Sequence, residues 1–154
     1  MTSKEIFFKH LAPTSHQPVL LEVESATGTI ITTTDGKKYY DLIAGIGVVS
    51  VGHNNKAVRQ AVIAQMNKHS HVMVYGEYLQ SAVNSLAKNL AYTLPESLST
   101  SYLVNSGTEA NEGAIKLAKR ITGRHKLIAF YKGYHGNTQG SMSISGNETK
   151  KKRI

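Results

Sequence analysis

The stretch that decides the fold is Val104-Asn-Ser-Gly-Thr-Glu-Ala-Asn-Glu-Gly-Ala-Ile-Lys-Leu-Ala-Lys119. Within it, Ser106 and Glu109 have the S-x-x-E spacing of a capping box, with Ser106 at the N-cap. The apolar positions that follow have helical periodicity. The sequence therefore predicts a helix from Thr108 to about Arg120.

Short apolar segments flank this helix. Residues 102–105 precede it and residues 126–131 follow it, and both are predicted to be strands. Gly123 is placed to end the helix between them. A strand, a helix and a strand at this spacing form a βαβ unit with parallel strands. The predicted fold class is therefore α/β, but two strands are too few for the two-sided sheet that such a unit normally joins.

The start of the 108–120 helix is a candidate anion site. Gly107 has no Cβ, so an anion can approach its amide closely. Free amides at residues 107–109 and the positive end of the helix suit a phosphate, and the Ser106 and Thr108 hydroxyls add donors. An ordinary helix cap accounts for the same spacing, and the residues alone leave both interpretations open.

A second candidate segment follows the second predicted strand, Tyr134-His-Gly-Asn-Thr138. Tyr134 lies between glycines, so its ring face could be available to a planar ligand; a half-buried surface aromatic is the alternative. His135 suits a proton carrier, a hydrogen-bond donor or a packed side chain.

The first half of the chain has simpler signals. Residues 28–40 with Asp35-Gly36 in their middle predict a β-hairpin. Residues 41–53 are apolar and glycine-rich, so we expect a buried loop or close-packed turn. Asn54 or Asn55 is expected to cap the next helix. After Gly76, leucines and alanines with a period of 3.6 predict a helix that ends before Pro95.

Composition narrows the classes of function. The chain has 154 residues, 40% of them hydrophobic and 18% charged, no cysteine and a net charge of +8. Four of the 18 basic residues lie in Lys150–Arg153, without interleaved aromatics, so we expect no nucleic-acid partner. No apolar run approaches the ~18 residues of a membrane span, and the N-terminus does not look like a signal peptide. We expect a cytoplasmic protein with no metal site and no membrane association.

Three motifs in order resemble the class III aminotransferases, in the branch of the acetylornithine, ornithine and 4-aminobutyrate enzymes. They are Asp41-Leu-Ile-Ala-Gly-Ile-Gly-Val with Gly52-His53, the Val104–Ala118 stretch, and Tyr134-His-Gly-Asn-Thr. The resemblance covers nearly the whole chain. It implies the N-terminal part of a fold-type I, pyridoxal-phosphate (PLP)-dependent transferase, homodimeric when complete.

The resemblance also implies roles for individual residues. Ser106, Gly107 and Thr108 would hold the cofactor phosphate, Tyr134 would stack on the pyridine ring and His135 would support it. His53 is expected to be structural. The Schiff-base lysine and the carboxylate at the pyridine nitrogen of the family lie downstream of Tyr134, so the 154 residues are expected to be a truncated portion that is inactive alone, with no catalytic residue of its own.

On the same basis, residues 1–70 are expected to be the N-terminal segment of the small domain and the crossing to the large one. Residues 71–154 would be the start of the large PLP-binding domain, with an incomplete sheet. The implied reaction is transamination between an amino acid or ω-amino compound and a 2-oxo acid. Another PLP reaction on this fold, such as that of an aminomutase or decarboxylase, and a non-catalytic phosphate-ligand binding or structural module remain alternatives.

Two departures from the family pattern bear on function. No proline follows Gly52-His53, which loosens the expectation for that turn. Asn137 stands where acetylornithine and ornithine enzymes commonly have an arginine that meets a substrate carboxylate. Asparagine cannot form that ion pair, so acetylornithine specificity is in doubt.

Overall fold

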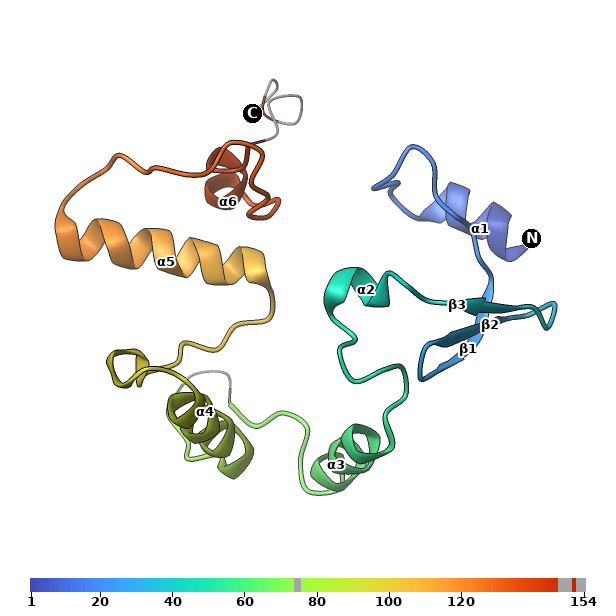
Figure 1. Cartoon of the computed structure of the whole chain (residues 1–154), viewed down its shortest axis with the longest axis horizontal. Helices are drawn as coiled ribbons and strands as arrows, with labels where there is room; N and C mark the ends of the chain where they lie inside the picture. Colours follow the sequence, from blue (N-terminus) through green and yellow to red (C-terminus); the bar gives the residue numbers. More distant parts are fainter. Residues whose placement is uncertain (74–75, 147–150, 152–154) are drawn as a thin grey trace. The chain divides into compact units, whose positions relative to one another are not determined.

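The computed structural model describes residues 1–73, 76–146 and 151. The chain divides into two compact units, Met1–Gly76 and Glu77–Ile154 (Figure 1). The division lies near the predicted change of domain at residue 70. The assignment of the two parts to a small and a large domain stays a prediction.

The first unit contains a helix and a three-stranded antiparallel sheet. Helix α1 (Ser3–His10) begins with a capping box between Thr2 and Glu5. Strands β1 (Val23–Thr27), β2 (Ile30–Thr33) and β3 (Lys38–Tyr40) follow, in the order β1-β2-β3.

The predicted hairpin is confirmed in this sheet. Strand β2 pairs with β3 in antiparallel register, with Ile31 opposite Tyr39. The turn between them holds Gly36 at a φ of 80°, a conformation that glycine adopts without strain. The Thr33 hydroxyl donates to Asp35 Oδ1 at 2.5 Å and stabilises the turn.

The expectation of a buried loop at residues 41–53 is wrong. The segment forms the short helix α2 (Ala44–Gly47) and tight turns, with Leu42 93% and Ile46 90% exposed. The turn itself is held locally, because Asp41 Oδ1 accepts hydrogen bonds from the amides of Ile43 and Ala44, both at 2.9 Å. Apolar composition and glycines therefore predicted the turn correctly. The predicted burial was wrong, because burial needs a second layer of chain against the turn.

Helix α3 (Lys56–Met66) ends the first unit's regular structure, and its predicted cap is confirmed. The Asn55 side chain accepts hydrogen bonds from the amides of Ala57 at 3.0 Å and Val58 at 3.2 Å. Its apolar residues nonetheless remain exposed.

The second unit holds the helices α4 (Ser81–Thr93), η1 (Glu96–Leu98), α5 (Gly107–Thr122) and α6 (Gln139–Ser143). Helix α4 matches the prediction: its last residue is Thr93, and the C-cap residue Leu94 comes just before Pro95. Helix α5 begins after Ser106 and ends at Gly123, which has the left-handed φ of 66°. Both ends of α5 thus agree with the caps expected from the sequence.

The two strands predicted beside α5 are not formed. Residues 102–104 and 126–130 have no regular structure in the described chain, and its one sheet consists of β1, β2 and β3. A strand needs the backbone of a neighbour to pair with, and neither segment has one here. The expected parallel βαβ pairing is therefore wrong for the described residues.

Both units expose their apolar side chains. No hydrophobic residue of the described part of the chain is buried, whereas Thr33, Ser141 and Ser145 are. In the second unit, α5 contacts α6, the helix that carries the buried Ser141; Figure 1 shows both helices. Across the ranges that the structure describes, no helix is long and apolar enough to span a membrane.

Candidate cofactor-binding site

The N-terminus of α5 has the geometry of a capped helix, and two of its backbone amides have no acceptor among the described residues. Ser106 is extended, with φ −152° and ψ 159°, and its Oγ accepts a hydrogen bond from the amide of Glu109 at 3.2 Å. The amides of Gly107 and Thr108 meet no acceptor among the described residues. Donors of this kind, at the positive end of a helix, favour an anion.

The predicted capping box is formed only in part. Its return arm was expected to run from Glu109 to the amide of Ser106. Instead, Glu109 Oε2 accepts from the amide of Asn105 at 2.7 Å. The Glu109 carboxylate therefore binds the backbone of Asn105, the residue before the N-cap, and does not bind the amides of Gly107 and Thr108. No heavy atom lies within 4 Å of a Cβ built on Gly107, so that side of the amide is open.

The segment carrying Tyr134 and His135 is fastened to α5. Asn111 Nδ2 donates to the carbonyl oxygen of His135 at 2.6 Å, and the His135 amide donates to Ser145 Oγ at 3.0 Å. Gly136, at φ 125°, lies so close to Thr108 that a Cβ would overlap that side chain. Glycine is therefore required here for the close approach as well as for the backbone conformation.

These contacts enclose a cavity of about 380 Å³. It is lined by Ser106, Gly107, Thr108, Asn111, Tyr134, His135, Gly136 and Asn137. All five residues that the sequence predicted to bind a cofactor lie on this one cavity, together with Asn137. Tyr134 is 69% exposed, so much of its side chain is accessible. His135 Nε2 is buried and has no hydrogen-bond partner among the described residues.

A network of hydroxyl groups lies behind the cavity. Thr108 Oγ1 is 2.9 Å from Thr138 Oγ1 and 2.5 Å from Ser141 Oγ. Glu112 Oε1 accepts from the Thr138 hydroxyl at 2.5 Å and from the amides of Gly140 and Ser141 at 2.9 and 3.0 Å. The Thr138 hydrogen bond and then the two amides hold the pKa of the Glu112 carboxyl below its ordinary value, so this group is ionised near neutral pH.

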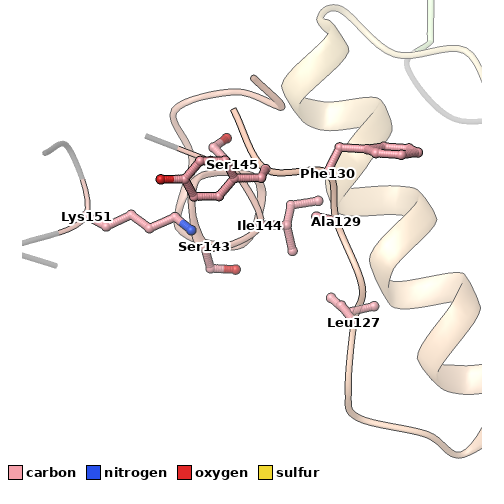
Figure 2. A pocket seen from close by; sticks show the side chains of 9 residues that line it. Leu127, Ala129, Phe130, Ser143, Ile144, Ser145 and Lys151 are labelled. Atoms are coloured by element: carbon pink, nitrogen blue, oxygen red, sulfur yellow. The ribbon is translucent and has the colours of Figure 1, made fainter. Parts of the chain in front are cut away.

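A second hollow of about 270 Å³ has a different character (Figure 2). Leu127, Phe130 and Ile144 give it an apolar wall, and the side chain of Lys151 extends toward Ser143. None of its described lining residues belongs to the start of one of the helices α1 to α6, in contrast to the α5 cavity. Of the described residues, no group of three or more histidines, cysteines or carboxylates is arranged to hold a metal.

His53 has a local role in the first unit. Its Nε2 lies 2.6 Å from Asp41 Oδ2, and its backbone exchanges two hydrogen bonds with Gly28, at 2.8 and 2.9 Å. The hydrogen bond from His53, followed by those from the amides of Ala44 and Ile43, lowers the pKa of Asp41. These contacts tie the 41–53 segment to the sheet and support the structural role expected for His53.

This chain resembles known proteins along most of its length. The sequence pattern of the family described as aminotransferase class-III matches residues 11–154. This chain belongs to the class III aminotransferase family. Class III aminotransferases are PLP-dependent enzymes.

Individual relatives agree with this membership. The class III chain is 38% identical over 139 residues to the acetylornithine aminotransferase of Listeria monocytogenes, covering 90% of this chain and 34% of that protein. It is 36% identical over 129 residues to the LysW-aminoadipate semialdehyde/glutamate semialdehyde transaminase of Sulfurisphaera tokodaii, covering 83% and 33%. The chain thus spans about a third of the length of the curated relatives it matches.

A solved structure confirms the fold class. The adenosylmethionine-8-amino-7-oxononanoate aminotransferase of Methanocaldococcus jannaschii superposes with a TM-score of 0.87 at 28% identity, over 95% of this chain and 36% of that one. The class III chain therefore has the α/β fold-type I architecture predicted from the sequence, as a part of it. The pairing of the two segments beside α5 and the burial of residues 41–53 differ from the prediction.

The residues of the α5 cavity fit PLP. The amides of Gly107 and Thr108, without an acceptor among the described residues, supply donors for a phosphate, and Gly107 has no Cβ to block its approach. A pyridine ring requires an accessible aromatic face at a short distance from those donors, and Tyr134 lines the same cavity. His135, which lines the same cavity, has a buried Nε2 without a hydrogen-bond partner among the described residues.

Several residues of this site were missed from the sequence. Asn111 and Glu112 hold the Tyr134–Thr138 segment, and Gly136, Thr138 and Ser141 complete the contact. One signal was available: Thr108, Asn111 and Glu112 are spaced by three and four residues, which places three polar side chains on one face of α5. The downstream partners were not predictable, because their approach depends on the path of residues 124–133.

Proposed function

We propose that this chain is the N-terminal portion of a PLP-dependent aminotransferase that exchanges an amino group between an amino acid or ω-amino compound and a 2-oxo acid. The observation that carries the proposal is the convergence of two free amides and an accessible tyrosine on one cavity. Family membership supports the same activity.

Five residues of the cavity have a part in holding the cofactor. The amides of Gly107 and Thr108, with the positive end of the 16-residue helix α5, bind the phosphate dianion. The Ser106 hydroxyl lies beside these two amides and is a further donor; its oxygen also accepts a hydrogen bond from the backbone amide of Glu109. Tyr134 stacks on one face of the pyridine ring and keeps water from it, and His135 supports that ring. When bound, PLP supplies the electron sink that this class of reaction needs.

Residues for proton transfer come from elsewhere in this proposal. No lysine of the 154 residues matches the position of the family's Schiff-base lysine: Lys116 and Lys119 lie on α5, past the phosphate loop. We therefore propose that the 154 residues bind PLP but do not catalyse transamination alone. In the complete enzyme we propose a cytoplasmic homodimer, without nucleic-acid or membrane partners.

Asn137 bears on the substrate. It lines the cavity next to His135 and Gly136 and carries no charge. An arginine at this position would form an ion pair with a substrate carboxylate, whereas an amide makes only neutral hydrogen bonds. We propose that the complete enzyme prefers an amino donor without a carboxylate at this point.

Titration of the 154-residue chain, carried as a soluble fusion, with PLP and with pyridoxal tests this function. The phosphate cradle predicts that PLP binds at least about tenfold more tightly than pyridoxal, because charge-assisted hydrogen bonds contribute about 1.5–3 kcal/mol each. Assays with amino donors and 2-oxo acids should show no turnover. Equal affinity for the two compounds would contradict the cradle, and turnover would contradict the inactivity of the chain alone.

A further inference from the structure

Glu112 is a carboxylate at the contact of α5 with α6, and it lies one helical turn behind the phosphate loop. Its Oε1 is 2.9 Å from the amide nitrogen of Gly140 and 3.0 Å from that of Ser141. A Cβ on Gly140 would overlap the carboxylate, so the backbone of α6 rests directly against it. The side chain therefore fixes where α6 begins.

The same oxygen controls the hydroxyl protons of the network. An ionised carboxylate is an acceptor only, so the Thr138 hydroxyl must donate its proton to Glu112. Thr138 Oγ1 is then left as an acceptor toward Thr108 and Ser141, at 2.9 and 2.7 Å. Thr108 therefore cannot accept a proton from Thr138, and its own hydroxyl donates to Thr138 or to Ser141, so Glu112 limits the orientations of the Thr108 hydroxyl.

We propose that Glu112 is a positioning residue for the cofactor phosphate: it holds Thr138 and the start of α6, and through them the Thr108 side chain and the Tyr134–Gly136 segment. The inference rests on the proposed function, because it concerns the same cavity. Asn111 fastens this segment at the carbonyl of His135, and Glu112 fastens it at the far end, residues 138–141. Glu112 itself does not line the cavity and acts through Thr108 and Thr138.

Charge alone does not account for this arrangement. A carboxylate close to a bound dianion is unfavourable, so its benefit has to come from the hydrogen bonds that it accepts. Glutamine has an oxygen in the same place that accepts all three hydrogen bonds without the charge. The pair Glu112→Ala and Glu112→Gln therefore separates loss of positioning from loss of charge. Glu96→Gln, on the exposed turn η1 of the same unit, is the matched control.

The experiment measures PLP affinity and amide hydrogen exchange in the 154-residue chain as a soluble fusion. We expect Glu112→Ala to weaken PLP binding by at least about tenfold and to speed exchange at Gly140 and Ser141. Glu112→Gln should restore most of both, and Glu96→Gln should resemble the unaltered chain. Adding Thr108→Val to Glu112→Ala should cost little more, because the two residues act as one unit.

Two results would overturn the inference: unchanged PLP affinity in Glu112→Ala, or effects of Glu112→Ala and Thr108→Val that multiply as for independent sites. Failure of the proposed function itself is distinguishable. In that case the unaltered chain shows no preference for PLP over pyridoxal, and exchange at Gly140 and Ser141, which needs no cofactor, decides alone whether Glu112 anchors the segment.

Discussion

Asn111 on α5 donates a 2.6 Å hydrogen bond from its amide nitrogen to the carbonyl oxygen of His135, 24 residues further along the chain. This bond places Tyr134 and His135 beside the phosphate loop. The geometry of the α5 cavity therefore depends on a residue that binds no cofactor atom in our proposal.

Replacing Asn111 tests this link. Asn111→Asp substitutes an acceptor-only group for the donor and sets it against a carbonyl oxygen, which is worse than removing the donor. We expect PLP affinity to fall by about tenfold in Asn111→Asp and by less in Asn111→Ala. Fluorescence titration with PLP measures both. Affinity in Asn111→Asp equal to that of the unaltered chain would show that the link does not matter for binding.

Tyr134 should act through its ring face. Tyr134→Phe keeps the ring and is expected to change PLP affinity little, whereas Tyr134→Ala should weaken binding by about 1–3 kcal/mol, the magnitude of base stacking on aromatic side chains. The same titration measures both variants. If Phe and Ala weakened binding equally, the hydroxyl rather than the ring would be the contributing group.

The Asp41–His53 contact should be lost in acid. Its hydrogen bonds lower the pKa of Asp41 below the ordinary value of 3.8. A depressed carboxyl pKa contributes stability above the unfolded value, and that contribution disappears as the pH falls through the folded pKa. The Gly28 amide, bonded to the His53 carbonyl, reports on the contact by NMR. We expect its shift to change below about pH 3.8 in the unaltered chain and to have no such transition in Asp41→Asn. The same transition in both would assign it to another group.

The apolar surface of the described residues predicts self-association. None of their hydrophobic side chains is buried, and the apolar face of α4 includes Val83 and Leu86, both exposed. Large exposed apolar surface marks an interface or an aggregation site. We expect the 154 residues without a fusion partner to bind ANS and to elute as a mixture of oligomers. A stable monomer with cooperative unfolding would instead favour the alternative of a self-sufficient binding module.

Local signals allowed much of this fold to be predicted from the sequence. Caps such as Asn55 and Ser106 and the glycine of the 35–36 turn act within a few residues, so their effect is visible in a short window. The strands at 102–105 and 126–131 were predicted wrongly, because pairing depends on a neighbour that no local pattern supplies. The burial of residues 41–53 was wrong for the same reason.

The residues of the candidate site also fall into two groups, those that local sequence signals indicate and those whose position depends on distant parts of the chain. The sequence pointed to Ser106, Gly107 and Thr108 as a candidate anion site because they form one helix N-terminus, and to Tyr134 and His135 as a second candidate segment; the resemblance to a family implied their roles, which stay predictions. The supporting residues Glu112, Thr138 and Ser141 were not predictable, because a contact between α5 and α6 across 26 to 33 residues cannot be read from periodicity.

The most direct test of the cradle is a pair of substitutions at Gly107. Helix α5 starts at Gly107, one residue earlier than predicted, so this is its first helical position, where proline is well tolerated. The extended backbone of Ser106 is the geometry that a residue before proline prefers. Gly107→Pro therefore removes one amide aimed at the phosphate and should leave the helix intact. Gly107→Ala also adds a Cβ, in open space, but keeps the amide.

The decisive measurement is PLP affinity in these two variants, with helix content by circular dichroism alongside. We expect Gly107→Pro to bind PLP at least about tenfold more weakly than Gly107→Ala, since one hydrogen bond to a charged group contributes about 1.5–3 kcal/mol, while helix content is equal in both. Equal PLP affinity in Gly107→Pro and Gly107→Ala would contradict it and leave Ser106 to Glu109 as a helix cap alone.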